Sequence, residues 1–294
     1  MIVTVAFFCR VFGQVSPLFS IISDNSAPDT SYPYTVFYSG NMKLRLSDCG
    51  CGANPMGGIH RAAFFIKDFE RKNGPVIKVD CGGFYDPGRN NPKRRTRLLF
   101  KAFKKLGYDA VNVTYGDLKA GMEFFEFPAP EYRGLNFINA NIKKKKKYAF
   151  KRYVMKDYKG LRFCITGIAA CKDSDKIKRS VYTVCPPARE AEDVFIMTRS
   201  ASDYYIILTD VDGETAADIV DRCPAPALVI RSDGRRDPSG TRIKNSVMLA
   251  SGAYGKYVTY ATFGKLFKEF GGLDFPLEAG SPGDPEFESI ISAE

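Results

Sequence analysis

Short apolar runs alternate with amphipathic segments along most of this chain of 294 residues. We expect strands where β-branched and aromatic residues cluster in short runs, and helices where apolar residues recur at helical spacing. The predicted strands cover 34–39, 75–79, 109–113, 135–142, 204–208 and 227–231, and the predicted helices cover 57–72, 96–106, 117–125, 188–200 and 214–222. This alternation predicts an α/β layered fold, in which the loops after the carboxyl ends of the strands form the functional face.

The remaining segments set the expected domain boundaries. A hairpin is predicted over 153–168 with its turn at Lys159-Gly160, and two further strands over 246–251 and 257–263. One domain is therefore placed over residues 34–265. Residues 266–294 are rich in Pro, Gly and acidic residues and are expected to form a tail.

Residues 1–33 are predicted to be an N-terminal extension or a degraded export signal, because the apolar runs over 2–8 and 11–23 are separated by Arg10. An export signal would place the protein in the periplasm or otherwise outside the cytoplasm, and a cytoplasmic protein is the alternative. No stretch approaches the roughly 20 apolar residues of a transmembrane helix, so no membrane span is expected.

The basic residues gather in two short runs. The chain has 43 Lys+Arg against 33 Asp+Glu, a formal net charge of +10, and the runs are PKRRTR at 92–97 and five lysines at 143–147. Both are predicted to be solvated, with an anion-binding patch as the alternative. Nucleic acid is not expected as a partner, whereas a protein partner is possible.

Histidine is almost absent, and His60 is the one present. A histidine-rich metal centre is therefore impossible, and a Ser-His-Asp triad could form only through His60. His60 lies on the predicted helix over 57–72, so we expect it to have a structural or surface role.

Seven blocks of sequence, in this order, suggest a known domain: GGIHRAAFFIK (57–67), VIKVDCGGFYD (76–86), LLFKAFKKLGYDAVNV (98–113), FINANI (137–142), RYVMKDYKGLRFCITGI (152–168), YYIILTDVDG (204–213) and VMLASGAYGKYV (247–258). Together they resemble the metallophosphoesterase (calcineurin-like phosphoesterase) domain of the 5'-nucleotidase family. The resemblance implies a layered α/β/β/α sandwich and two metal ions held at the strand ends by Asp, His and Asn, which bind phosphate and generate a hydroxide nucleophile.

The metal ligands implied by the resemblance do not carry over to this chain. The family motifs D-x-H, G-D, G-N-H-[DE], a later His and G-H-x-H fall on positions that we call the substituted ligand positions: Asn41, Lys43, Gly83, Tyr115, Gly116, Asp210, Asp233 and Arg235. Two-metal phosphoesterase activity is therefore not expected. Asn41, Asp210 and Asp233 could hold Mg²⁺ or Ca²⁺, but salt bridges with Lys43 and Arg235 are the favoured interpretation.

Cysteines are the second candidate chemistry. The stretch around Cys49-Gly50-Cys51 resembles a Cys-Gly-Cys loop of exported, redox-linked relatives of that family, some of them selenoproteins. Cys81 and Cys171 follow other predicted strands, so all four cysteines are expected at the same sheet edge, where Lys43 and Arg61 would favour a thiolate in the loop. A redox-active thiol site or a thiolate-bound metal would result, with structural disulfides or inert thiols as the alternative.

The sequence thus predicts a catalytically degenerate protein of the metallophosphoesterase fold, with a thiol redox or thiol-metal function. The pocket at the sheet edge is expected to be lined by Cys49, Cys51, Cys81, Lys43 and Arg235. A non-catalytic interaction subunit of a larger assembly and a residual metal-dependent phosphoester hydrolase are the two alternatives.

Overall fold

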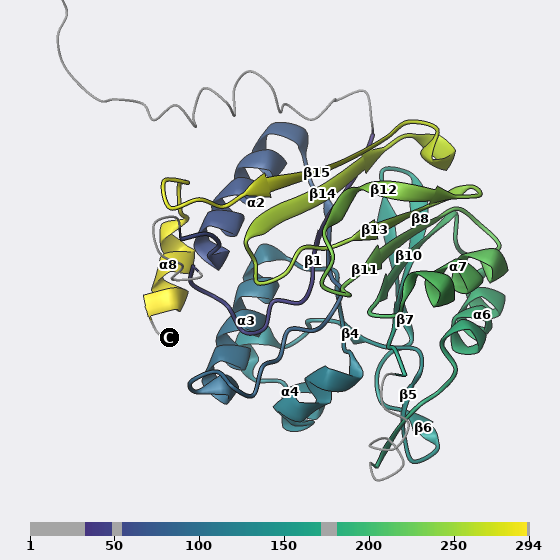
Figure 1. Ribbon diagram of the computed structural model, residues 1–294, viewed down its shortest axis with the longest axis horizontal. Coiled ribbons are helices and arrows are strands. Elements are labelled where there is room, and N and C mark those ends of the chain that lie inside the picture. The colour runs from purple at the N-terminus through teal and green to yellow at the C-terminus, as the bar shows by residue number, and fades with distance from the viewer. Residues whose placement is uncertain (1–32, 49–54, 172–180, 293–294) are drawn as a thin grey trace, which may run out of the picture.

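A computed structural model describes residues 33–48, 55–171 and 181–292 of the chain. Two six-stranded sheets form its centre (Figure 1). The first has the order β15 (Phe270–Pro276), β14 (Tyr257–Phe263), β1 (Tyr34–Ser39), β2 (Ile77–Asp80), β3 (Ala110–Asn112) and β4 (Phe137–Ile138). The second has the order β12 (Asp237–Ile243), β13 (Ser246–Ala250), β11 (Ala227–Arg231), β10 (Tyr204–Thr209), β8 (Leu161–Ile168) and β7 (Tyr153–Tyr158).

Most strands within each sheet are parallel, so their carboxyl ends lie at one edge. Strands β1, β2, β3 and β4 pair in parallel, and so do β8, β10, β11 and β13. The antiparallel pairs are β14 with β1, β15 with β14, β7 with β8, and β12 with β13.

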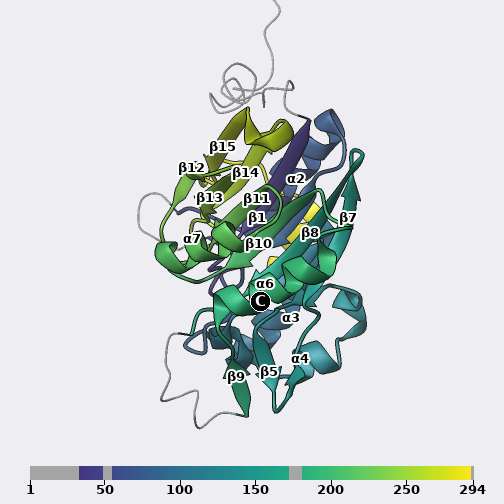
Figure 2. The same ribbon diagram turned by 90° about the vertical axis from the view of Figure 1, so that its right-hand side faces the viewer.

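Helices cover the outer face of each sheet (Figures 1 and 2). Helices α2 (Ile59–Asn73) and α3 (Pro92–Leu106) pack on the first sheet, and α8 (Pro285–Ser292) packs against these two helices. Helices α6 (Pro187–Thr198) and α7 (Gly213–Arg222) pack on the second sheet. A separate core between the sheets contains fully buried aliphatic side chains from both, among them Val36, Val79, Ile165, Ile206 and Leu228. The layered α/β/β/α sandwich expected from the resemblance is confirmed.

Helix α3 illustrates why the sequence forms these elements. Pro92 stands in its first turn, where a missing N–H costs nothing, and Gly107 ends it in the left-handed conformation with φ of 70°. Leu99, Phe100 and Phe103 recur at helical spacing and are fully buried against the first sheet. The predicted helix over 96–106 therefore exists and begins at Pro92.

Shorter elements fill the connections. Three 3₁₀ helices, η1 (Tyr115–Ala120), η2 (Pro130–Tyr132) and η3 (Lys265–Phe267), and one short helix, α4 (Glu123–Glu126), occur among the described residues. A three-stranded sheet with the order β6 (Lys147–Tyr148), β5 (Ile142–Lys144) and β9 (Tyr182–Val184) lies beside the second sheet. The predicted strand over 135–142 is thus divided between β4 and the start of β5.

The expectation of a tail over residues 266–294 is wrong for the part that the structure describes. Strand β15 pairs with β14 over its whole length, from Tyr257↔Pro276 to Phe263↔Phe270. Helix α8 buries Phe287 and Ile290 in the core shared with α2 and α3. These segments complete the first sheet and its helical layer, because β15 pairs with β14 and α8 buries its apolar side chains against α2 and α3.

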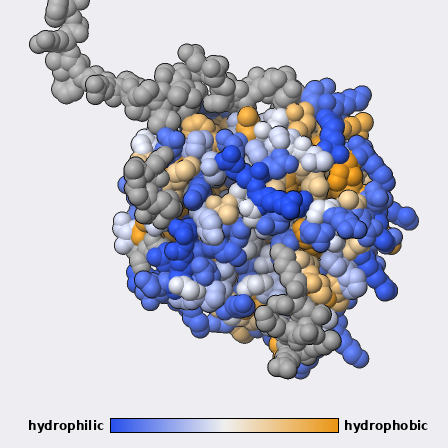
Figure 3. All heavy atoms as spheres, viewed as in Figure 1, coloured by the Kyte–Doolittle hydropathy of each residue, from blue (hydrophilic) through white to orange (hydrophobic). Residues whose placement is uncertain are grey.

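The expected N-terminal extension lies outside the described residues except for Pro33. Within the described ranges, no helix is both long and apolar enough to cross a bilayer. The face drawn in Figure 3 is mainly hydrophilic, with hydrophobic residues in small separate groups.

One buried amide joins the two sheets. The Asn112 side chain at the end of β3 has its Nδ2 at 3.1 Å from the Cys81 carbonyl oxygen in the first sheet and at 3.2 Å from the Leu208 carbonyl oxygen in the second. Its Oδ1 accepts a hydrogen bond from Asn139 Nδ2 at 3.2 Å. Gly167 leaves room for this amide, since a Cβ at that position would clash with Asn112 Oδ1.

Replacing this amide should therefore destabilise the fold. Asn112→Ala removes the hydrogen bonds that Asn112 makes to carbonyl groups of both sheets and to the Asn139 amide, so the free energy of unfolding should fall by about 2–4 kcal/mol in urea titrations. Asn245→Ala, at an exposed position, is the matched control and should change it by less than about 0.5 kcal/mol. Equal losses in the two variants would contradict the linking role of Asn112.

Candidate functional site

A cavity of about 500 Å³ opens at the carboxyl ends of the parallel strands of both sheets. Its walls come from the loops after β1, β2, β3, β8, β10 and β11, which meet there because the parallel strands end at one edge. The lining residues are Asn41, Lys43, Gly83, Thr114, Tyr115, Gly116, Lys119, Ala170, Asp210, Ser232 and Asp233.

The structure brings together seven of the eight substituted ligand positions, and Arg235 is the exception. Arg235 has a side chain that is 82% exposed and lies 3.9 Å from an Asp233 carboxylate oxygen at its Nε. The expectation that Arg235 lines the pocket is therefore wrong. It belongs to a turn beyond the cavity, because Gly234 takes a positive φ of 89° between Asp233 and Arg235.

The loop after β1 is held against the loop after β2 by the backbone. The Asn41 N–H donates to the Gly82 carbonyl oxygen at 2.7 Å, and Asn41 and Lys43 both have left-handed φ angles, of 53° and 51°. Gly83 has φ of 72°, and a Cβ there would lie 3.3 Å from Asn41 Cα. A glycine at 83 thus permits the close approach of the two loops, and it also leaves the cavity without a side chain at that position.

The charges that line the cavity have different surroundings. Asp233 is paired with the buried guanidinium of Arg231, and the Asp210 carboxylate accepts a hydrogen bond from the Ala170 N–H at 2.6 Å. The Lys43 and Lys119 ammonium groups have no carboxylate within ion-pair distance among the described residues. Two cations therefore remain available to a molecule that enters the cavity.

The lining does not fit a pair of metal ions. Its oxygen ligands would be Asn41, Asp210 and Asp233, and Asp233 is already held by Arg231. The Lys43 ammonium lines the same cavity and would repel a cation. In the described part of the chain, no group of three or more His, Cys, Asp and Glu side chains could hold a metal ion. The Mg²⁺ or Ca²⁺ interpretation gains no support from this arrangement.

Two buried carboxyl groups lie next to the cavity rather than in it. Asp117 accepts hydrogen bonds from the backbone N–H groups of Gly83, Tyr85 and Thr114, and from the Thr114 hydroxyl. Burial raises the pKa of Asp117, and these hydrogen bonds oppose the rise. Asp117 thus fixes the loops after β2 and β3, which present Gly83 and Thr114 to the cavity.

Asp80 is the second buried carboxyl group, at the end of β2. It accepts hydrogen bonds from the Ser39 hydroxyl at 2.6 Å and from the Gly82 N–H at 2.8 Å. Burial raises the pKa of Asp80 to about 7, and the charge of Asp117 adds to the rise, while the two hydrogen bonds oppose it. Close to neutral pH, Asp80 therefore exists in both protonation states.

Of the four cysteines expected at the sheet edge, the structure describes Cys81 and Cys171. Cys49 and Cys51 lie outside the described residues. Cys81 is fully buried in the core between the sheets, and burial, together with Asp80, raises the pKa of its thiol well above the ordinary value. Cys171 is exposed and follows Ala170 of the cavity wall. The expectation that Cys81 lines the pocket is wrong, because its side chain points from the strand end into the intersheet core.

The described flanks of the Cys-Gly-Cys loop pair with each other. Asp48 and Gly57 form an isolated antiparallel bridge, and neither is part of the cavity lining. Arg61 donates to the Gly57 carbonyl oxygen at 2.6 Å and lies 3.9 Å from an Asp48 carboxylate oxygen. Arg61 therefore already has partners in these flanks.

His60 has no part in the cavity. It lies on α2, where its ring packs so closely on Gly283 that a Cβ there would clash with its Cδ2, and its backbone carbonyl accepts from the Asp284 N–H. Burial lowers the pKa of His60, and the Arg61 charge lowers it further. These contacts attach α2 to the segment before α8, which is a structural role.

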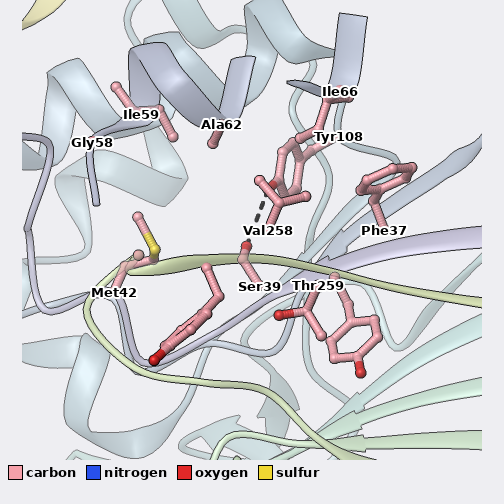
Figure 4. Close-up of a pocket in the computed structure, with 13 residues that line it drawn as sticks. Phe37, Ser39, Met42, Gly58, Ile59, Ala62, Ile66, Tyr108, Val258 and Thr259 are labelled. Atoms are coloured by element: carbon pink, nitrogen blue, oxygen red, sulfur yellow. Dashed lines mark hydrogen bonds between the residues drawn. The ribbon is translucent and has the colours of Figure 1, made fainter. Parts of the chain in front are cut away.

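A second, much smaller cavity of about 30 Å³ lies between the first sheet and α2 (Figure 4). Its lining is mainly apolar, with Met42, Ile59 and Val258 among its members. Its polar feature is the Ser39 hydroxyl, 3.1 Å from the Tyr108 hydroxyl, and Ser39 also donates to Asp80. The space suffices for one or two water molecules, not for a substrate.

Solved structures with the same fold support the architecture. They include the Thermus thermophilus sulfate thiohydrolase SoxB in complex with glycerol (13% identity, TM-score 0.74, 89% of this chain and 60% of that chain) and a 5'-nucleotidase precursor from Thermus thermophilus (12%, 0.72, 88% and 58%). The calcineurin-like phosphoesterase YfkN from Bacillus subtilis is similar over 88% of this chain and 95% of that chain (14%, 0.70).

The chain therefore has the metallophosphoesterase fold of the calcineurin-like phosphoesterases and 5'-nucleotidases. It spans about six-tenths of the length of the first two structures. No protein-family model matches the sequence, and no curated protein matches it.

Sequence reasoning missed two residues of this region. Lys119 reaches the cavity from η1, and its position one helical turn after Tyr115 and Gly116 could have indicated this. Arg231 ends the buried strand β11, and a charged residue at the end of such a strand is a signal for a partner nearby. Its partner proves to be Asp233.

The raised pKa of Asp80 predicts a pH-dependent stability. The Asp80 carboxyl group keeps its proton in the folded protein up to about pH 7, whereas in the unfolded chain it loses the proton near pH 4. The stability that this proton contributes is complete below about pH 4 and is lost as the pH rises through about 7. The free energy of unfolding of wild type relative to Asp80→Asn should therefore fall between about pH 5 and pH 7 and stay level up to pH 8, by about 2–3 kcal/mol in all. Urea titrations at these pH values measure it, and a constant difference would contradict the assignment.

Proposed function

We propose that this protein binds a small oxyanion in the cavity and does not hydrolyse phosphoesters by a two-metal mechanism. The observation that carries the proposal is the Lys43 ammonium, which lines the cavity without a carboxylate partner among the described residues. Lys43 stands where the resemblance would place a metal-binding histidine. A cation on the protein at that point favours an anionic ligand in place of a metal ion.

The charge balance and the size of the cavity support the same conclusion. With Asp233 neutralised by Arg231, the lining keeps Lys43 and Lys119 against the single carboxylate of Asp210. A volume of about 500 Å³ is in the range of small-ligand sites. Two of the similar structures carry sulfate and nucleotide in their names, and both compounds are anions.

The proposed binding mode uses side chains that are already positioned. The ammonium groups of Lys43 and Lys119 would donate charged hydrogen bonds to the anion, which are stronger than bonds between neutral groups. Asp233 would stay on Arg231, so it would neither bind a metal ion nor repel the ligand strongly. The Thr114 hydroxyl of the lining donates to Asp117, but this carboxylate also accepts three backbone N–H groups that fix the loops after β2 and β3, so we expect binding without turnover.

Isothermal titration with inorganic phosphate and with sulfate tests the binding. Lys43→Ala and Lys119→Ala should each weaken the affinity at least about fivefold, which corresponds to about 1 kcal/mol. Lys265→Ala is the matched control, since this exposed lysine on η3 is not part of the cavity lining. Binding that is equal in all variants would exclude the cavity as the site.

Turnover is measured with 4-nitrophenyl phosphate in the presence of Mn²⁺ or Mg²⁺, and the rate should equal that of the buffer. Hydrolysis that is abolished by Asp210→Ala or Asp233→Ala would instead establish the residual metal-dependent hydrolase and overturn the proposal. Anion binding and metal-dependent hydrolysis would use the same cavity, so the aspartate variants show whether any hydrolysis takes place there.

A thiol redox or thiol-metal function is proposed as a second role, restricted to Cys49 and Cys51. A Cys-x-Cys pair can close a strained and therefore reducible disulfide, or supply two thiolates to a metal ion. The Asp48–Gly57 bridge supports it, because this bridge brings the two ends of the Cys-Gly-Cys loop together. Cys81 is left out, since its buried thiol has a strongly raised pKa.

Thiol counting before and after reduction, combined with elemental analysis, tests this role. The native protein should gain a pair of thiols on reduction or contain a bound metal, and Cys49→Ser/Cys51→Ser should lose that gain or that metal. Cys81→Ser should retain it, because Cys81 lies in the intersheet core. A native protein with neither a reducible pair nor a metal would leave the loop without thiol chemistry.

A further inference from the structure

An aromatic groove of about 290 Å³ lies apart from the cavity, between α4, β4 and the residues after β6. The rings of Phe125, Phe137 and Phe150 line it. Phe125 packs edge-on against both others, with ring centroids 5.0 Å and 5.3 Å apart. None of these residues contributes to the oxyanion cavity, so the groove requires its own explanation.

One large apolar side chain at the end of this groove is left in solvent. Phe127 is 78% exposed and directly follows Glu126, which lines the groove. A phenylalanine that is so exposed, next to a hollow with aromatic walls, provides apolar surface that a bound segment could cover.

The edge of the groove is strongly basic. The five lysines 143–147 form the hairpin of β5 and β6, which we call the lysine hairpin, and Lys144 Nζ reaches Glu126 Oε1 at the groove over 2.9 Å. Lys145, Lys146 and Lys147 are exposed and have no carboxylate partner among the described residues. On the other side, Lys151 donates to the Asn136 side-chain oxygen at 3.0 Å rather than to an acid.

We propose that the aromatic groove and the lysine hairpin form one docking site for an acidic peptide segment of a partner protein that carries an aromatic or large aliphatic side chain. The apolar side chain enters the groove and covers Phe127, and the carboxylates of the segment pair with Lys145, Lys146 and Lys147. Charge complementarity selects this occupant, because the hairpin offers three cations that the protein itself does not neutralise within the described residues.

Two other occupants fit less well. A second copy of this chain would bring another surface with a formal net charge of +10, which opposes its approach to the lysine hairpin. Single-stranded nucleic acid binds by stacking bases on open ring faces, whereas the rings of this groove pack edge to face, at 79° and 87°. The proposal is independent of the oxyanion cavity, because the two sites share no residue.

Fluorescence anisotropy with a labelled peptide of about twelve residues, in which glutamates alternate with phenylalanines, tests the site. The full chain should bind it, and Lys145→Glu/Lys146→Glu and Phe127→Ser should each weaken binding at least about fivefold. All three residues are exposed, so the variants should fold. Lys265→Glu/Lys268→Glu, an equal charge reversal at exposed positions on and beside η3, should leave the affinity within about twofold.

Altered peptides test the contributions of the aromatic groove and the lysine hairpin separately. A peptide with serine in place of phenylalanine should bind wild type more weakly than the original peptide does. It should bind wild type and Phe127→Ser with equal affinity. No binding of the acidic peptide, or binding that both groove and hairpin variants leave unchanged, would overturn the proposal. Tighter binding of an oligothymidine than of the peptide, with Phe127→Ser unaffected, would overturn it in favour of a nucleic-acid surface.

Discussion

The buried Asn112 amide is the contact on which the rest of this structure depends. It lies between the carbonyl groups of Cys81 in one sheet and Leu208 in the other, and thus sets how the two sheets meet. A buried amide has to satisfy its hydrogen bonds, so these bonds favour one relative position of the sheets. Since the strands on both sides are parallel, that position brings six loop ends to one cavity.

The cavity keeps the scaffold of its fold but has a different charge balance. Asp117 still organises the loops after β2 and β3 through four hydrogen bonds. Lys43 adds a cation to the wall, and Arg231 occupies the Asp233 carboxylate. This charge balance is the basis of the proposed anion site, whereas two metal ions would require carboxylates that do not pair with cations of the protein. The aromatic groove and the lysine hairpin form a second basic region with an apolar centre, on different elements.

Sequence reasoning succeeded for elements whose pattern is local and failed where the tertiary structure supplies the partner. Residues 34–39 and 227–231 are mostly apolar strands, and the predicted bounds of both agree with the structure. Strand β12 carries Pro238 and Gly240 and has little apolar character, so no local signal marks it, and its pairing with β13 decides it. Strand β15 contains Gly271 and Gly272, and it forms because β14 offers an edge.

The sequence by itself determined the α/β layering, the position along the chain of the strands with a local apolar pattern, and the identity of the residues after them. Helix and strand periodicities are local, so they can be recognised without the tertiary structure. Only the tertiary structure decided which of those residues share a cavity. It places the Cys81 side chain in the core and the Arg235 side chain in solvent. It also brings Lys119 to the cavity and pairs Asp233 with Arg231. The direction of a side chain after a strand end depends on the turn and on the opposing sheet, and neither can be read from local sequence.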